Sequence, residues 1–219
     1  MYFPITIIDN FYDDFDQIKN LADQTQYFKK KIFSMPGIET KPLHEIYPLL
    51  FNQACQRILV SFFNRHVLRN LNWFCESKFE KIIPYGNDYE KTGWVHNDDS
   101  NKLSGILYLQ GDEDEGTSFY SNTRPGVMDI NKLIIKEKLH AGEKIDPNEY
   151  NLNLKEHNNN FKKILTVSNI PNRIVLFDSS ILHAADGYGS FEKPRMIQTF
   201  FFRDINCDFF PIPELKRIK

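Results

Sequence analysis

The chain has 219 residues with 14% aromatic content, a length and composition that fit one folded domain with a sizeable hydrophobic core and exclude an intrinsically disordered chain. A formal net charge of −2 and a pI of about 6.3 give no strong electrostatic signal for nucleic-acid binding. Three widely separated cysteines without a Cys-x-x-Cys pair argue against a disulfide framework or a zinc knuckle.

The apolar runs are far shorter than the ~20 residues that a membrane-spanning helix needs. The first residues also lack the basic start of a secretory signal. We therefore expect a cytoplasmic protein that is not embedded in a membrane. We expect the whole chain, 1–219, to form a single domain, and the sequence does not indicate its oligomeric state.

The N-terminal part is predicted to be mostly helical. Residues 5–8 are mostly β-branched and favour a short strand. Acidic residues favour a helix start near position 13, and apolar residues at helical spacing continue to about residue 26. Residues 27–42 are rich in loop signals. Apolar residues at helical spacing then predict a second helix from 48 to about 65.

The rest of the chain is predicted to form short strands separated by Gly, Asp, Asn and Pro clusters. The strand candidates are residues 72–83, 93–98, 103–110, 116–121, 173–178 and 195–203. Several short strands after two helices are typical of a β-sandwich or jelly roll buttressed by helices.

An insertion at about 122–170 separates two of these strand candidates. It contains a basic amphipathic piece and an asparagine-rich tract at 148–160. One interpretation is a surface excursion. The other is a lid or substrate platform beside an active site, because long loops in compact domains are often functional.

Two histidines and an aspartate are candidates for a metal site. His96 and Asp98 form a His-x-Asp pair in a predicted strand, where residues two apart share a face, and His183 follows a buried strand and a turn. Two imidazoles and one carboxylate form the facial triad of non-haem Fe(II) oxygenases. Arg195 opens the last predicted strand with Thr199 on the same face, and its planar guanidinium suits the distal carboxylate of a 2-oxo acid.

Several ordered motifs resemble the Fe(II)/2-oxoglutarate-dependent dioxygenase superfamily, most closely its prolyl-hydroxylase-like branch. The resemblance covers about 75–202. Its motifs are Tyr85-Gly86 followed by 93–98 for the first metal motif, 103–110 and 115–120 for a strand pair, and 173–183 and 195–202 for the closing strands. Gln110 stands where an asparagine is usual. The resemblance implies an α+β protein with a double-stranded β-helix (jelly roll) core and N-terminal helices packed on one sheet.

The resemblance also implies a set of site residues and a reaction. The implied Fe(II) ligands are His96, Asp98 and His183. The implied 2-oxoglutarate-binding residues are Arg195, Tyr108, Thr199 and Tyr85. The implied reaction uses 2-oxoglutarate and O2 to hydroxylate a C–H bond of a small-molecule or peptidyl substrate, prolyl residues included, with release of succinate and CO2.

Two alternatives stay open at this point. A jelly-roll metalloenzyme can use the same triad with another metal, such as zinc or manganese, and it has no need of an inward-facing Arg195. A non-catalytic binding module can keep a vestigial site and use the insertion to contact a partner.

Overall fold

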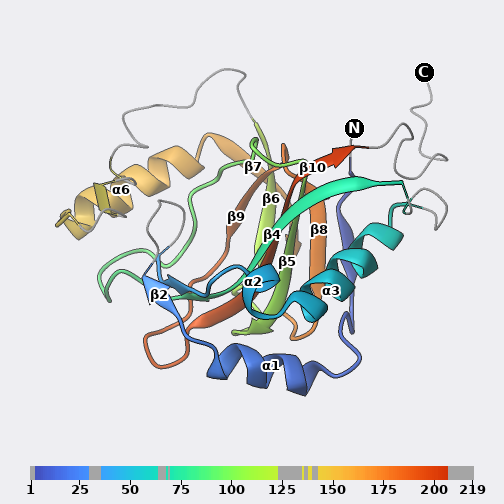
Figure 1. Cartoon of the computed structure of the whole chain (residues 1–219). Coiled ribbons are helices and arrows are strands. Elements are labelled where there is room, and N and C mark those ends of the chain that lie inside the picture. The colour runs from blue at the N-terminus through green and yellow to red at the C-terminus, as the bar shows by residue number, and fades with distance from the viewer. Residues whose placement is uncertain are drawn as a thin grey trace, which may run out of the picture.

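The protein is described by a computed structural model for residues 3–29, 36–63, 68, 70–122, 135, 138–139 and 143–206. Its strands are β1 (Thr6–Ile8), β2 (Phe28–Lys29), β3 (Ile38–Glu39), β4 (Asn72–Ile82), β5 (Leu103–Gln110), β6 (Thr117–Asn122), β7 (Phe161–Val167), β8 (Ile174–Asp178), β9 (Leu182–Ala185) and β10 (Arg195–Asn206). Its helices include α1 (Phe15–Gln24), α2 (Leu43–Ile46), α3 (Pro48–Val60) and α6 (Pro147–Asn158) (Figure 1).

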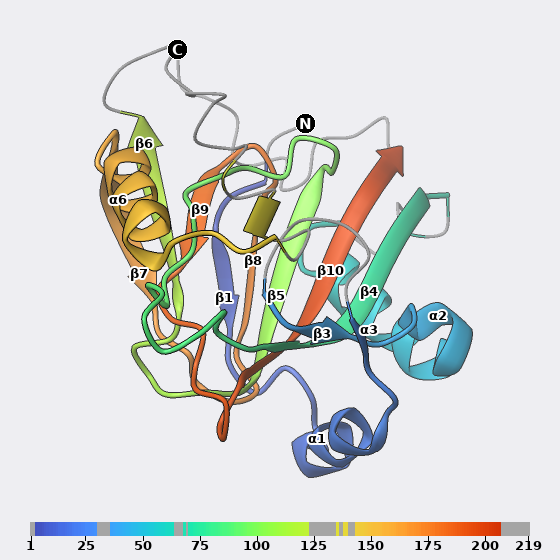
Figure 2. The same ribbon diagram turned by 90° about the vertical axis from the view of Figure 1, so that its left-hand side faces the viewer.

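The strands form two antiparallel sheets that face each other. The major sheet has seven strands in the order β1-β8-β5-β10-β4-β3-β2, and the minor sheet has three in the order β7-β6-β9. Figure 2 shows the minor sheet with α6 on one side of the major sheet and α2 and α3 on the other. This arrangement confirms the predicted α+β fold, a double-stranded β-helix with N-terminal helices packed on one sheet.

The N-terminal helices form where local signals predict them. The Asp14 side chain caps α1 by accepting a hydrogen bond from the backbone N–H of Gln17. Helix α3 has proline at its first position, where the missing N–H costs nothing. Its buried residues, including Phe51, Cys55 and Ile58, recur at helical spacing and pack against the major sheet. The helices therefore close one face of that sheet.

The side chains of strand β10 point alternately to the two faces of the major sheet. Phe200 and Phe202 join the core under the helices, whereas Ile197 joins the core between the two sheets. Arg195 and Thr199 lie on the same face as Ile197 and line a cavity there. The period of two thus brings Arg195 and Thr199 between the sheets, as the sequence predicts.

Several parts of the chain differ from the predicted elements, which include neither α2 nor β9. Residues 93–98 form only an isolated bridge at His96, because the chain turns away after that residue. The predicted loop 27–42 contains the two-residue strands β2 and β3. The insertion contains α6 and β7. Strand β7 lies at the edge of its sheet, and its inner residues are exposed, so it lacks the alternation that marks a half-buried strand. Residues 123–134 of the insertion lie outside the described residues.

Truncation of Phe200 to alanine is expected to lower the free energy of unfolding by ~3–5 kcal/mol, because the ring is fully buried and its removal leaves a cavity. Urea denaturation followed by circular dichroism measures this change. Phe191 is 50% exposed, so Phe191→Ala is the control and should cost less than about 1 kcal/mol. Equal effects of the two substitutions would contradict the assigned core.

Candidate active site

The structure brings His96, Asp98 and His183 together between the sheets. The Nε2 atoms of His96 and His183 lie 3.9 and 3.5 Å from the carboxylate oxygens of Asp98. One nitrogen or oxygen of each residue lies within 4.8 Å of the other two, a spacing that could hold a metal ion. Two imidazoles and a carboxylate therefore converge on one point, from parts of the chain more than 80 residues apart in sequence.

Backbone hydrogen bonds, rather than a continuous strand, position these ligand atoms. His96 and His183 exchange backbone hydrogen bonds of 3.0 and 2.8 Å as an isolated antiparallel bridge. The Asp98 N–H donates to the carbonyl of Ser179, just after β8, at 2.8 Å. The predicted convergence of His96 and Asp98 thus arises from a bridge followed by a turn, not from one face of a strand.

Both histidines are held in the tautomer that suits a metal ligand. His96 Nδ1 lies 2.8 Å from the carbonyl oxygen of Trp94, and His183 Nδ1 lies 2.9 Å from that of Ile181. A carbonyl oxygen can only accept, so Nδ1 carries a proton in each ring, and Nε2, on the side of Asp98, is the atom that can bind a metal. A ring N–H bonded to a carbonyl in this way is the usual outer support of a metal-binding histidine.

The carboxylate of Asp98 is also held in place. Its Oδ2 accepts a hydrogen bond of 2.9 Å from the Ser104 hydroxyl on β5, which itself lies 2.8 Å from the Ser179 hydroxyl. Both serines are fully buried. This support fixes one carboxylate oxygen and leaves the other, Oδ1, on the side of His96.

A cavity connects the triad to Arg195. It is lined by Glu80, His96, Asp98, Ile106, Thr117, His183, Ala185, Arg195, Ile197, Thr199 and Phe201. Arg195 is 1% exposed, and its Nη2 donates to the hydroxyl of Thr117 at 3.3 Å. The Tyr108 hydroxyl donates to the same Thr117 oxygen at 2.9 Å. Arg195, Thr117 and Tyr108 therefore form a polar pocket beside the cavity.

The guanidinium of Arg195 is buried without an anionic partner among the described residues. Its Nε has no hydrogen-bond partner there, and no described carboxylate forms an ion pair with it. Burial is the main cause that lowers the pKa of Arg195. An arginine keeps its charge nonetheless, so this position favours an anion brought in from outside the chain.

Two polar residues that line the cavity, Thr117 and Glu80, are not among the site residues predicted from the sequence. Thr117 stands in the motif at 115–120, and its alternation with the buried Phe119 was the signal for an inward side chain. Glu80 is 5% exposed and accepts a hydrogen bond of 3.2 Å from the Thr199 hydroxyl. Glu80 follows the charged residues Glu76 and Lys78 at a period of two, so its face of the strand looks solvent-exposed in the sequence.

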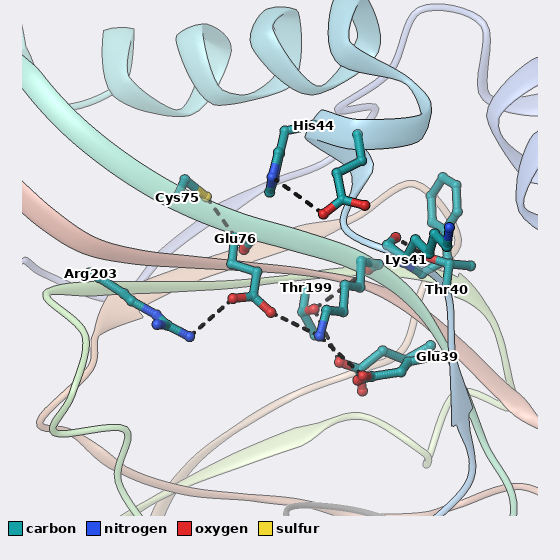
Figure 3. Close-up of polar contacts among 12 residues, drawn as sticks. Glu39, Thr40, Lys41, His44, Cys75, Glu76, Thr199 and Arg203 are labelled. Carbon is teal, nitrogen blue, oxygen red and sulfur yellow. Dashed lines mark hydrogen bonds and ion pairs between the residues drawn. The ribbon is translucent and has the colours of Figure 1, made fainter. Parts of the chain in front are cut away.

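Thr199 lines the cavity but bonds away from Arg195. Its hydroxyl lies 3.2 Å from Glu80 and 3.5 Å from the carbonyl oxygen of Lys78 on β4. Ion pairs of 2.8–3.0 Å continue this polar face along β10 and β4 and reach β3 (Figure 3). They join Arg203 to Glu76, Glu76 to Lys78, and Lys78 to Glu39.

Tyr85 lies in an aromatic cluster and not among the residues that line the cavity. Its ring centroid is 6.0 Å from that of Tyr89 and 5.8 Å from that of Tyr150. Burial raises the pKa of Tyr85. A contact between Tyr85 and a co-substrate therefore stays a prediction from the resemblance, without support from the cavity.

Several solved structures of proteins that bind or depend on 2-oxoglutarate share the fold of this chain. HygX from Streptomyces hygroscopicus, with nickel and 2-oxoglutarate bound, is 10% identical with a TM-score of 0.54 over 90% of this chain and 82% of that chain. EvdO2 from Micromonospora carbonacea var. aurantiaca, complexed with 2-oxoglutarate, is 11% identical with a TM-score of 0.52 over 95% and 90%. The epimerase SnoN from nogalamycin biosynthesis, described as non-heme and alpha ketoglutarate dependent, is 10% identical with a TM-score of 0.53 over 94% and 81%.

The fold is thus shared with proteins that bind or depend on 2-oxoglutarate, in agreement with the fold expected from the sequence motifs. The chain itself belongs to a family of unknown function, DUF6445, whose profile matches residues 2–188. A search of curated protein sequences found no match. Among the described residues, no helix is long and apolar enough to cross a membrane.

Proposed function

We propose that the chain is an Fe(II)- and 2-oxoglutarate-dependent oxygenase that hydroxylates a C–H bond of a small-molecule or peptidyl substrate. The single observation that carries this proposal is the pairing of two sites in one cavity. One is a group of two histidines and an aspartate with convergent ligand atoms, and the other is the buried cation Arg195, which forms no ion pair with a described carboxylate. A dianionic co-substrate that bridges a metal and an arginine fits both sites.

The donor set fits Fe(II). His96, Asp98 and His183 would supply two imidazole nitrogens and one carboxylate oxygen, which leave open positions for other ligands. When bound, iron and 2-oxoglutarate together supply oxidative decarboxylation with O2, which yields succinate and CO2 and a hydroxylated product. The Nδ1 hydrogen bonds described above leave Nε2 of each ring as the atom that would bind the metal.

Arg195 would bind the distal carboxylate of 2-oxoglutarate and so orient the co-substrate in the cavity. Its unpartnered Nε and the Thr117 hydroxyl are donors in reach of this pocket, and the Tyr108 hydroxyl, which donates to the Thr117 oxygen, orients the Thr117 hydroxyl. Charge-assisted hydrogen bonds from a guanidinium to a carboxylate are strong and directional. The buried position of Arg195 also excludes water from the pair.

A second HygX structure holds hygromycin B together with nickel and 2-oxoglutarate, which supports a small-molecule substrate as one class for this fold. We also propose that the whole chain forms one domain. Strands from both ends of the described chain support this proposal, because β1 pairs with β8 while β10 pairs with β4 and β5 in the same sheet.

Anaerobic addition of Fe(II) and then 2-oxoglutarate to the metal-free protein tests the proposal. We expect a weak visible charge-transfer band from the chelated co-substrate, measured by difference absorption. The band should require both additions. Excess succinate should compete with 2-oxoglutarate for the site and so weaken the band. Bound metal without a band would favour a metalloenzyme of another kind. Failure to bind any metal would favour a binding module with a vestigial site.

A further inference from the structure

The backbone segment that carries His96 is bonded on both of its edges. On one edge it lies beside β9: the Gly93 N–H donates to the carbonyl of Ala185 at 2.8 Å, and His96 pairs with His183. Successive residues of an extended chain point their N–H and C=O groups to opposite sides. The backbone groups of Val95, the residue before His96, therefore face away from β9. The carbonyl of Gly93 also faces away from β9, and these groups need other partners.

Side chains at the end of α6 provide those partners. Asn158 accepts from the N–H of Val95 and donates to the carbonyl of Gly93, both at 3.0 Å. His157 Nε2 donates to the carbonyl of Val95 at 2.8 Å. The His157 side chain is buried, with 2% exposure, and its ring centroid lies 5.1 Å from that of Trp94. Asn158 and His157 thus take the place of a neighbouring strand.

Asn151, seven residues before Asn158 and two turns back along the same face of α6, makes the same pair of backbone hydrogen bonds. Asn151 accepts from the N–H of Glu90 and donates to the carbonyl of Asp88, both at 2.8 Å. The Tyr150 hydroxyl accepts from the indole N–H of Trp94 at 3.0 Å. Each asparagine bonds an N–H and a carbonyl two residues apart. Helix α6 therefore holds residues 88–95 at both ends.

We propose that α6 is a clamp that positions His96 as a metal ligand, with Asn158 and His157 as positioning residues that act through the backbone of Val95. His96 Nδ1 donates to the carbonyl of Trp94, so the orientation of its ring follows the conformation of residues 93–96. Outer partners that orient a ligating histidine commonly control metal affinity. The inference rests on the proposed metal-binding function, and it gives the insertion a supporting role.

Titration of the metal-free full-length chain with Co(II), followed by its visible absorption, tests the clamp. Asn158→Ala removes both bonds of the amide, and His157→Phe removes the donor but keeps a ring between Trp94 and Phe161. We expect each variant to bind Co(II) about 10-fold more weakly with an altered spectrum. Hydrogen exchange of the Val95 amide in the metal-free protein should also become faster in Asn158→Ala.

The matched control is Asn153→Ala, because the Asn153 amide bonds the carbonyl of Glu149 within the same helix. It should change the Co(II) affinity by no more than about twofold. Variants that bind Co(II) as wild type does would overturn the clamp alone, and so would an equal loss in the control. If Asn158→Ala does not fold, His157→Phe decides. A wild-type chain that binds no Co(II) would overturn the proposed function and the clamp with it.

Discussion

Replacement of Asp98 by asparagine is expected to weaken Fe(II) binding by at least about 100-fold, beyond the loss typical for an outer partner of a metal ligand. Asp98 is the anionic member of the triad, and a neutral amide is a much poorer ligand for a divalent cation. Asparagine keeps the size of the side chain and can still accept from the Ser104 hydroxyl, so the fold should persist. Competition with a coloured chelator measures the affinity, and turnover of 2-oxoglutarate should disappear with it.

The next residue provides a close control for this substitution. Asp99 is an exposed carboxylate in the same turn, outside the group whose ligand atoms converge. Asp99→Asn removes the same charge from the same turn, but it should leave Fe(II) affinity within about twofold of wild type because Asp99 is not among the converging ligands. Wild-type affinity in Asp98→Asn, or an equal loss in Asp99→Asn, would show that the Asp98 carboxylate does not bind the metal.

Replacement of Arg195 by methionine is expected to weaken 2-oxoglutarate binding by about 100-fold or more, on the scale of the ~3 kcal/mol lost when one partner of a buried charge pair is removed. In the absence of co-substrate, the free energy of unfolding of this variant should equal or exceed that of wild type. The guanidinium is 1% exposed and lacks an ion-pair partner among the described residues, so its burial is unfavourable until an anion binds. Methionine fills much of the same space without a charge.

Two measurements separate these effects. Loss of the charge-transfer band at a fixed 2-oxoglutarate concentration reports co-substrate affinity, and denaturant unfolding without co-substrate reports stability. Arg203→Met is the control, because Arg203 lies on the same strand but is exposed and ion-paired with Glu76. A large loss of stability with unchanged co-substrate affinity in Arg195→Met would assign Arg195 a purely structural role.

Local pattern was sufficient for most of the fold. The bounds of β5 match the predicted range, and β4, β6 and β8 differ from theirs by only one residue. Alternation also predicted that Arg195 and Thr199 share a face, and β10 places both between the sheets. These features depend on side chains close together in sequence, where the period of a strand or helix sorts residues by face.

The site itself needed more than local pattern. The motif order indicated the triad, but the positions of His96 and Asp98 depend on hydrogen bonds to His183 and Ser179, about 80 residues later in the sequence. The contact between Thr117 and Arg195 could not be predicted from local pattern either. The two residues lie on different sheets and meet only because the sheets face each other.

The role of the insertion could not be predicted from the sequence, and the reason is physical. The asparagine-rich tract contains Asn151 and Asn158, and each bonds backbone groups of residues about 60 positions earlier. A backbone N–H or carbonyl is the same in every residue, so such bonds leave no complementary pattern of side chains to detect. Strand alternation and the order of the metal motifs could be read from the chain alone. Only the packing of α6 against residues 88–95 decided what holds His96 in place.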